Sequence, residues 1–300
     1  MTFPLVPRGR LVGLSFGTMR SFHRGAGSDV AGSRRYHPGD DVHAIDWAAS
    51  ARLSSARERD EFIVRERFAD EAPRVVLVCD RRPEMAFFAP PLPWLDKAAA
   101  MRHTVELILQ STALVGGFAG YLDFGDGEPW WLPPQSGRRL WELREERLPS
   151  PAFDAPEDTI ARSLAHVVQH PRAVTPGSFV FCLSDFLDPP PAEGWLTALE
   201  HRFDIVPVVI QDPTWEQSFP DVSGVVCPLR DPRTHRLAEV RLRRREVETR
   251  RRANEERLRG LLAGLEQLDL DPVLVSSADP VHILAAFLEW AELRRARRVA

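Results

Sequence analysis

From residue 70 onward the chain alternates short apolar runs with longer segments of helical periodicity. Continuous apolar runs such as residues 74–80 are typical of strands buried on both faces of a parallel sheet. Apolar residues recurring every three or four positions predict the helices that cover such a sheet, so we expect an α/β fold with a mostly parallel sheet. The predicted strands are 74–80, 120–124, 129–132, 178–184, 204–211 and 272–276, and the predicted helices are 95–112, 157–170, 191–201, 243–268 and a last helix that begins after Asp279.

Two parts of the chain depart from this alternation. Residues 224–242, with Asp231-Pro232-Arg233-Thr234 at their middle, predict a β-hairpin inserted before the long helix. Residues 1–70 are rich in glycine, serine and arginine and have no regular period. We therefore expect two domains: a small irregular or β module at 1–70 that packs on the sheet, and the α/β domain at 71–300.

The basic residues are almost all arginine. Of the 39 lysine and arginine residues only Lys97 is a lysine, and no glycine-rich turn precedes it. A phosphate-binding loop of the GxxxxGK[ST] type needs such a lysine, so the chain is not itself a P-loop ATPase. Kinase chemistry that uses a strand lysine is excluded on the same ground, and a Schiff-base enzyme would have to use Lys97.

Charge and apolar content favour a soluble, unsecreted, cytoplasmic protein. The net charge is −4, with +2 over residues 1–70, +4 over 230–300 and −10 between them, which gives no case for nucleic acid as a partner. The arginines of 243–268 follow glutamates at i,i+4 spacing, so we interpret them as a solvated helix face. The three cysteines lie in apolar runs without a CxxC pattern, which is typical of reduced thiols, and we expect no integral membrane segment because the longest uncharged apolar stretch is too short.

One stretch in the first module is dense in charged and aromatic side chains. Residues 35–52 read Arg-Tyr-His-Pro-Gly-Asp-Asp-Val-His-Ala-Ile-Asp-Trp-Ala-Ala-Ser-Ala-Arg. The Pro-Gly-Asp step predicts a turn, and Ile45 and Trp47 alternate with Asp46 as in a strand. From the residues alone we expect a surface cluster of ion pairs around a tight turn, anchored by Trp47.

This string closely resembles the R-x-Y-x-P-G-D-D-x-R-x-I-D-W-x-x-S-A-R signature of the bacterial domain-of-unknown-function 58 family. His43 stands where that family usually has arginine, and the sequence lacks the pair of amino-terminal membrane helices found in many relatives. The resemblance implies a von Willebrand factor A-like domain after the signature, and a role as a binding or adaptor protein beside MoxR-type AAA+ ATPases. The candidate binding residues in the signature are Arg35, Tyr36, Gly39, Asp40, Asp41, Asp46, Trp47 and Arg52.

The resemblance also raises the question of a metal site. Von Willebrand A-like domains often bind Mg²⁺ through D-x-S-x-S after the first strand, a later threonine and a later aspartate, because this ion prefers hard oxygen ligands. Here both serines are replaced, by Arg82 and Glu84. The candidate residues of a degenerate site are Asp80, Glu84, Thr159 and Asp185, so we expect no cofactor, with Mg²⁺ as a possibility.

Three interpretations of this edge remain open. Because a guanidinium group cannot ligate a metal, Arg82 could lie between Asp80 and Asp185 and supply the positive charge that the ion would have given. Alternatively, Arg82 could point to solvent while Asp80, Glu84 and Asp185 hold an ion. In the third interpretation Asp80 only caps the following turn.

Adjacent tryptophans at 130 and 131 predict one further surface. Neighbouring side chains on a strand point to opposite faces, so we expect one of the two to be exposed. Trp131 is then either covered by a neighbouring loop or an anchor for a protein partner.

Two functions from different classes are compatible with these residues. The first is a non-enzymatic adaptor that docks a AAA+ ATPase or its client. The alternative is a metal-dependent hydrolase that uses the Asp40, Asp41 and Asp46 carboxylates in a two-metal arrangement. The neighbouring arginines would satisfy these acids without metal, which favours the adaptor.

Overall fold

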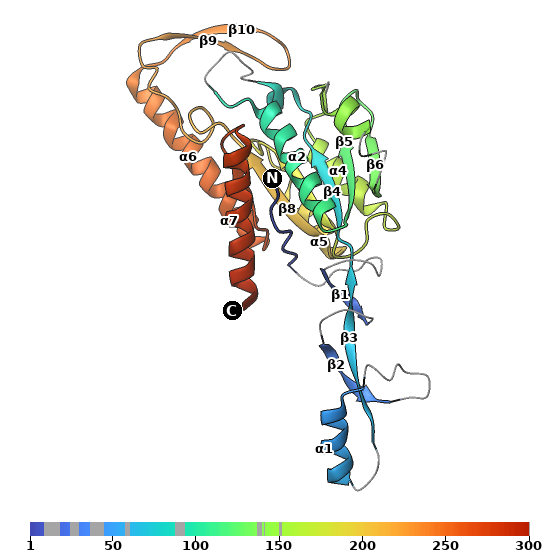
Figure 1. Ribbon diagram of the computed structural model, residues 1–300. Coiled ribbons are helices and arrows are strands. Elements are labelled where there is room, and N and C mark those ends of the chain that lie inside the picture. The colour runs from blue at the N-terminus through green and yellow to red at the C-terminus, as the bar shows by residue number, and fades with distance from the viewer. Residues whose placement is uncertain are drawn as a thin grey trace.

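The largest part of the molecule is a six-stranded sheet with the order β11-β8-β7-β4-β5-β6 (Figure 1). The computed structural model describes residues 1–8, 19–24, 30–36, 45–57, 61–87, 94–136, 140, 142–149 and 152–299. Five strands of the sheet are parallel, and β6 pairs antiparallel with β5. The strands are β4 (Arg74–Cys79), β5 (Phe118–Asp123), β6 (Trp130–Gln135), β7 (Phe179–Ser184), β8 (Asp204–Ile210) and β11 (Val273–Val275).

Helices cover both faces of this sheet, so the predicted α/β class and mostly parallel sheet are confirmed. One face carries α2 and α7, and the other carries α4, α5 and the carboxyl end of α6. Within the described ranges, no helix is both long and apolar enough to cross a membrane. The helices are α2 (Lys97–Leu114), α4 (Thr159–Val168), α5 (Ala192–Glu200), α6 (Arg244–Gln267) and α7 (Pro280–Val299), with the short helical turns η2 (Pro83–Ala86) and η3 (Leu143–Arg147).

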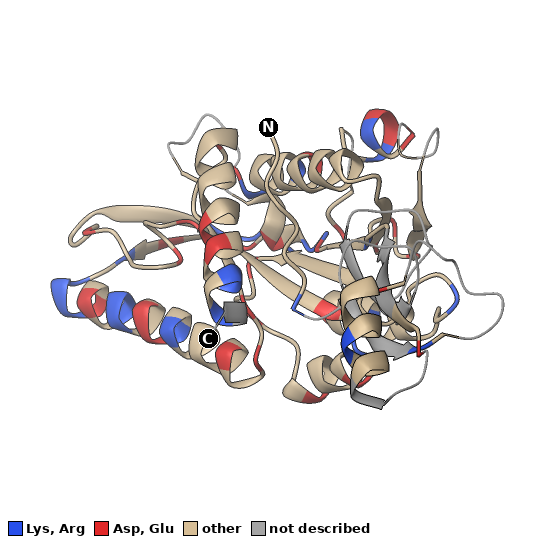
Figure 2. Ribbon diagram, turned by 60° about the horizontal axis from the view of Figure 1, so that its bottom comes forward, with Lys and Arg blue, Asp and Glu red and all other residues tan. Residues whose placement is uncertain are grey.

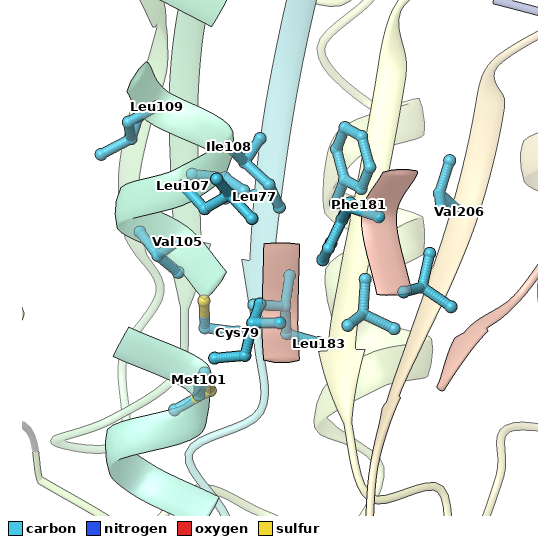
Figure 3. Close-up of a cluster of buried hydrophobic side chains, with 14 of the residues drawn as sticks. Leu77, Cys79, Met101, Val105, Leu107, Ile108, Leu109, Phe181, Leu183 and Val206 are labelled. Atoms are coloured by element: carbon cyan, nitrogen blue, oxygen red, sulfur yellow. The ribbon is translucent and has the colours of Figure 1, made fainter. Parts of the chain in front are cut away.

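The central strands are apolar on both faces because both faces are covered. Val75, Leu77 and Cys79 point to the side of α2 and α7, while Val76 and Val78 point to the opposite core. Figure 3 shows Leu77 and Cys79 against α2. Burying a side chain of this size stabilises the fold by about 1.5–3 kcal/mol, which explains why the continuous apolar run was a reliable strand signal.

The chain reverses its direction of travel across the sheet at β4. β4 pairs with β5 on one side and with β7 on the other, so the loops after β4 and β7 leave the same edge in opposite directions. In open α/β sheets the crevice at such a switch point is where ligands bind. Asp80 follows β4 and Asp185 follows β7, so this topology brings the two predicted aspartates together.

The first residues of the chain belong to the core of the sheet domain. Phe3, Leu5 and Val6 are buried among the side chains of α2 and α7, and the Phe3 ring centroid lies 4.6 Å from that of Phe287. The sequence placed these residues in the separate module because their apolar pattern is too short to reveal where it packs.

The rest of the first module is an arm that projects from the sheet domain (Figure 1). It has a three-stranded antiparallel sheet, with β3 in the middle, and one helix. β3 ends two residues before β4 begins, so the arm extends from the amino-terminal end of β4. The elements are β1 (Met19–Arg24), β2 (Val30–Arg35), α1 (Trp47–Arg57) and β3 (Ile63–Glu71).

The predicted hairpin is present between β8 and α6. It consists of β9 (Val226–Arg230) and β10 (Leu237–Arg241), which pair with each other and with no other described strand. Figure 2 shows the hairpin beside α6, along which basic and acidic positions of the ribbon alternate. The ion pair between Glu248 and Arg252, at 3.0 Å, agrees with a helix face that neutralises its own charge.

Candidate functional site at the carboxyl edge of the sheet

A buried chain of alternating charges lies at the switch point. It runs from Asp80 through Arg82, Asp185 and Lys97 to Glu216, and the exposed fraction of these residues is 6% or less. Each basic group lies between two acidic groups. The five formal charges sum to −1, so the chain nearly neutralises itself.

Arg82 lies between the two predicted aspartates. Its Nε and Nη2 donate to the two oxygens of Asp80 at 2.9 and 2.7 Å, and Nη2 also donates to Asp185 Oδ1 at 3.1 Å. The Asp80 carboxylate also accepts from the backbone N–H of Arg82 and from the Ser184 hydroxyl. Arg82 therefore does not point to solvent, because the Asp80 carboxylate would otherwise be buried without a counter-charge.

Lys97, the only lysine of the chain, completes the arrangement. Its ammonium donates to Asp185 Oδ2 at 2.9 Å and to Glu216 Oε1 at 2.7 Å. Burial alone would lower the pKa of Lys97, but the charges of Asp185 and Glu216 outweigh burial and raise the pKa above its usual value. A protonated amine is not a nucleophile, so this environment disfavours the Schiff-base role that the sequence left open.

The residues present do not fit a divalent ion. Arg82 and Lys97 have no lone pair to offer, and together they engage all four oxygens of Asp80 and Asp185. Among the described residues there is no cluster of three or more histidine, cysteine or acidic side chains that could hold a metal. The geometry thus corresponds to the first of the three interpretations above.

The two remaining residues of the degenerate site lie outside the ion chain. Glu84 pairs with Arg233 at the tip of the β9–β10 hairpin, with Nε–Oε1 and Nη2–Oε2 distances of 2.8 and 3.2 Å. Thr159 begins α4 and is buried, and its hydroxyl has no hydrogen-bond partner among the described residues. In this structure the Glu84 carboxylate is engaged by Arg233, and a site that Glu84 shares with Asp80 and Asp185 stays a prediction.

The backbone is constrained where Asp185 leaves β7. The next residue, Phe186, has a φ of 47°, in the left-handed region that bulky residues avoid. Its backbone N–H donates to the Ser184 hydroxyl, and its ring is buried against Trp195. Packing and hydrogen bonding thus hold a costly turn, which directs the Asp185 carboxylate toward Arg82 and Lys97.

Arg81 points away from Arg82 and forms a second buried network. Its guanidinium donates to the Tyr121 hydroxyl at 2.7 Å, and that hydroxyl donates to Asp123 at 2.7 Å. Arg147 pairs with the same Asp123 carboxylate. Burial raises the pKa of Tyr121 well above its usual value, so the phenol keeps its proton and this network acts as a clamp between β4 and β5.

An open cleft lies beside the ion chain. It has a volume of about 290 Å³ and is lined by the start of α4 and by the loop between β7 and α5. Glu157 and Asp158 are exposed on one wall, and Asp188 with the following prolines forms the other. The exposed carboxylates of Glu157, Asp158 and Asp188 make the cleft acidic, although Arg162 pairs with Asp158 at 2.7 Å and Arg233 lies 3.7 Å from Glu157.

Trp130 and Trp131 are both half-buried, so the expectation that one of them is exposed is wrong. They point to opposite faces of β6: Trp130 packs on Tyr121, and Trp131 packs on His166 and His170 at the end of α4. Elements on both faces of the sheet cover this edge strand. Trp131 is therefore a packing residue in the described structure, and an anchoring role would use only its remaining exposed surface.

The signature residues in the arm have a different arrangement from the predicted one. Ile45 bridges Val64 of β3, but Trp47 begins α1, and the Asp46 carboxylate accepts from the Ala49 N–H at 3.0 Å as a helix cap. The strand-like alternation over 45–47 was misleading, because the capping preference of aspartate decides the local structure. Gly39, Asp40 and Asp41 lie outside the described residues.

Three aromatic rings pack together in the described part of the arm. The Phe62 ring packs edge-to-face on both Tyr36 and Trp47, at centroid distances of 6.4 and 6.0 Å. Trp47 is nevertheless 60% exposed and Phe62 43%. Arg35 pairs with Glu61 at 3.5 Å, and Arg52 is exposed and donates to the Ala48 carbonyl of its own helix.

The Ser50 hydroxyl links α1 to β3. Ser50 is buried, donates to the Asp46 carbonyl and accepts from the Ile63 N–H at 2.8 Å. Sequence reasoning did not name Ser50 as a site residue, nor did it place Lys97, Ser184 and Glu216 at the other site. Only Lys97 had a visible signal, since a lone lysine in an arginine-rich chain is itself unusual.

Comparison with known proteins decides the family. Residues 32–259 match the family described as "Protein of unknown function DUF58". The chain belongs to this family. Among curated proteins, this DUF58 chain is similar to "Uncharacterized protein Rv1480" of Mycobacterium tuberculosis and "Uncharacterized protein Mb1516" of Mycobacterium bovis, each 25% identical, with 75% of this chain and 68% of the relative covered.

Two solved structures also resemble the DUF58 chain. One is "conserved hypothetical protein BatB from Bacteroides thetaiotaomicron", with 13% identity, a TM-score of 0.44, and coverage of 75% of this chain and 99% of the other. The second is "an aerotolerance-related membrane protein from Bacteroides fragilis", with 11% identity, a TM-score of 0.43, and coverage of 74% and 99%. At these identities and TM-scores the similarity supports no argument about the functional site.

Proposed function

We propose that this DUF58 protein is a non-enzymatic adaptor that docks a protein partner at the carboxyl edge of its sheet without a metal ion. The observation that carries the proposal is the pairing of Asp80 and Asp185 with Arg82 and Lys97. A metal-dependent adhesion site keeps an open coordination position for a carboxylate of its partner. Here the positive charge comes from Arg82 and Lys97, which already pair with buried carboxylates. The partner would therefore contact the surface around the site instead.

The proposed docking surface is the acidic cleft beside the ion chain. Glu157, Asp158 and Asp188 are exposed there, and the ion chain beneath holds the loops after β4 and β7 in fixed positions. A rigid, preorganised surface loses little conformational entropy on binding. The proposed partner is a MoxR-type AAA+ ATPase or its client, as the family resemblance implies, and it would present basic side chains to this cleft.

The hydrolase alternative has less support. One of its three carboxylates, Asp46, accepts a hydrogen bond from the first turn of α1 and lies beside the aromatic surface of the arm. A ligand role would compete with this capping interaction. The alternative requires that an Asp40→Ala, Asp46→Ala double variant remain folded and lose a metal-stimulated activity, whereas the adaptor proposal requires loss of folding of the arm or of partner binding.

The test is direct binding of a purified MoxR-type ATPase from the same host, measured by biolayer interferometry with and without ATP, and with and without EDTA. We expect nucleotide-sensitive binding that EDTA does not change. Asp188→Arg should weaken it at least tenfold. Glu200→Arg is the matched control, because Glu200 is equally exposed but lies at the far end of α5. Absence of binding in both nucleotide states, or its loss in EDTA, would contradict the proposal.

A further inference from the structure

The β9–β10 hairpin is a two-stranded ribbon with little cover. Val226, Leu229 and Leu237 are 51%, 39% and 66% exposed, and the two strands pair only with each other within the described chain. Figure 1 shows it arching from the start of α6 across the top of the molecule. An isolated two-stranded hairpin is at best marginally stable in water, so this ribbon gains from further pairing.

Pro228 determines which backbone groups face outward. It lies opposite Glu239 in the antiparallel ladder. Because proline has no N–H, this pair is the type in which neither residue bonds to the other, so the N–H and C=O of Glu239 point away from β9. By the same alternation, the backbone groups of Leu237 and Arg241 also point outward, while those of Ala238 and Val240 bond to β9.

The two edges of the ribbon are therefore different. The outer edge of β9 lacks the donor at Pro228, a device that protects edge strands from pairing. The outer edge of β10 presents a complete set of donors and acceptors at Leu237, Glu239 and Arg241. A strand can be added to β10 but is disfavoured on β9.

The net charge of the hairpin and its flanking residues determines which partner segment it would attract. Between Gly224 and Arg245 there are seven arginines and two acidic residues, a net charge of +5. One acid, Asp231, is engaged in the turn, where its carboxylate accepts from the backbone N–H groups of Arg233 and Thr234. A second copy of this basic ribbon would be repelled, whereas an acidic segment would be attracted.

The hairpin is also held in place. Arg233, in the turn that joins the strands, pairs with Glu84 in the turn after β4 and lies 3.7 Å from Glu157. These contacts attach the tip of the ribbon to the sheet domain. The edge of β10 is thereby presented in a defined orientation.

We propose that the outer edge of β10 is a strand-addition site for an extended acidic segment of a partner protein. In such complexes main-chain hydrogen bonds supply affinity, and the alternate side chains supply specificity. Leu237 on the exposed face would contact apolar side chains of the segment, and the arginines would contact its carboxylates. This inference does not depend on the acidic cleft or on the identity of the partner proposed there.

The test uses a capped nonapeptide in which glutamate alternates with valine and threonine, and the same peptide with lysine in place of glutamate. Binding to the ¹⁵N-labelled full chain is followed by amide shifts and hydrogen exchange. We expect the acidic peptide to slow exchange at Leu237, Glu239 and Arg241 and to bind at least tenfold more tightly than the lysine peptide. Equal binding of the two peptides, or no binding of either, would overturn the proposal.

Two substitutions of Glu239 distinguish the contribution of its backbone N–H to peptide binding from that of its side chain. Glu239→Pro removes an outward N–H, so the hairpin should persist, with Ala238 and Val240 still protected, while peptide affinity falls at least tenfold. Glu239→Ala keeps the N–H and removes a like charge, so affinity should be retained or increased. Unchanged binding by Glu239→Pro, or a dimer of the free chain that this substitution dissolves, would overturn the proposal.

Discussion

The protein uses arginine in opposite ways at the carboxyl end of β4 and in the arm. After β4, Arg82 is buried and pairs with the buried Asp80. In the arm, Arg35 and Arg52 are exposed, and Arg35 forms a surface ion pair with Glu61 at 3.5 Å. Burial decides the role: a buried ion pair has to be complete, whereas an exposed one contributes little to stability and remains available for a partner.

If burial decides the role of these arginines, the largest loss of stability should follow from replacing Arg82. Arg82→Ala leaves the buried Asp80 carboxylate without its counter-charge and Asp185 with Lys97 alone, and we expect the free energy of unfolding to fall by about 3–5 kcal/mol. Urea denaturation followed by circular dichroism measures this loss. Arg52→Ala in the arm is the matched control and should change stability by no more than about 0.5 kcal/mol. Similar effects of the two substitutions would remove the distinction between the two regions.

Lys97→Met should have the next largest effect. Asp185 keeps Arg82 as a partner, so we expect a loss of about 2–3 kcal/mol, chiefly from the unpaired Glu216. The pKa of Lys97 is raised in the folded state, so its contribution is complete below its usual value of 10.5 and declines as the pH rises through the folded value. The wild type should therefore lose more stability than Lys97→Met when unfolding is compared at pH 9 and above pH 10.5. An equal loss in both proteins would contradict this role of Lys97.

A smaller effect is expected at the cap of α1. Asp46→Ala removes the carboxylate that accepts from the Ala49 N–H, which should cost about 1 kcal/mol. Because α1 lies in the arm, we expect hydrogen exchange to increase at Ala49 and Ser50 but not in β4. Asp46→Asn keeps an acceptor and serves as the control. Faster exchange in the central strands would show that the arm and the sheet domain unfold together.

The smallest effect on stability is expected at the most exposed aromatic ring. Trp47→Ala should alter the free energy of unfolding by no more than about 0.5 kcal/mol, since the side chain is 60% exposed. If the arm is an interface, the same substitution should weaken ATPase binding by about 2 kcal/mol or more, the usual effect of removing an anchoring tryptophan. Phe3→Ala, in the core, should do the reverse and lower stability by about 3–5 kcal/mol without acting on the partner directly. A loss of stability at Trp47 comparable to that at Phe3 would contradict the assignment of Trp47 to the surface.

The fold was predictable where burial makes the pattern simple. The strands around 74–80, 178–184 and 204–211 have continuous apolar runs because helices cover both faces of the sheet. The strands of the arm were not found, since their sequences are polar and their pairing is interrupted by register shifts. For α1, the Asp46 cap and the Ala-Ser-Arg run after Trp47 carried the helical signal, but the alternation of 45–47 obscured it.

The candidate site was predictable only in part. Asp80, Arg82 and Asp185 could be brought together because all three follow strands of a parallel sheet at a switch point. Lys97 and Glu216 could not, because Lys97 begins α2 and Glu216 lies in a loop after β8, and no local pattern links them. The pairing of Glu84 with Arg233 could not be predicted, because Arg233 is 149 residues away in sequence.

The central claim is that Arg82 and Lys97 replace a metal ion between Asp80 and Asp185. Titration of the purified chain with Mg²⁺ and Mn²⁺ by isothermal calorimetry tests it most directly, with Asp185→Asn as the control. The account predicts no saturable heat for either ion and an unchanged melting temperature in EDTA. Stoichiometric binding that Asp185→Asn abolishes would contradict it.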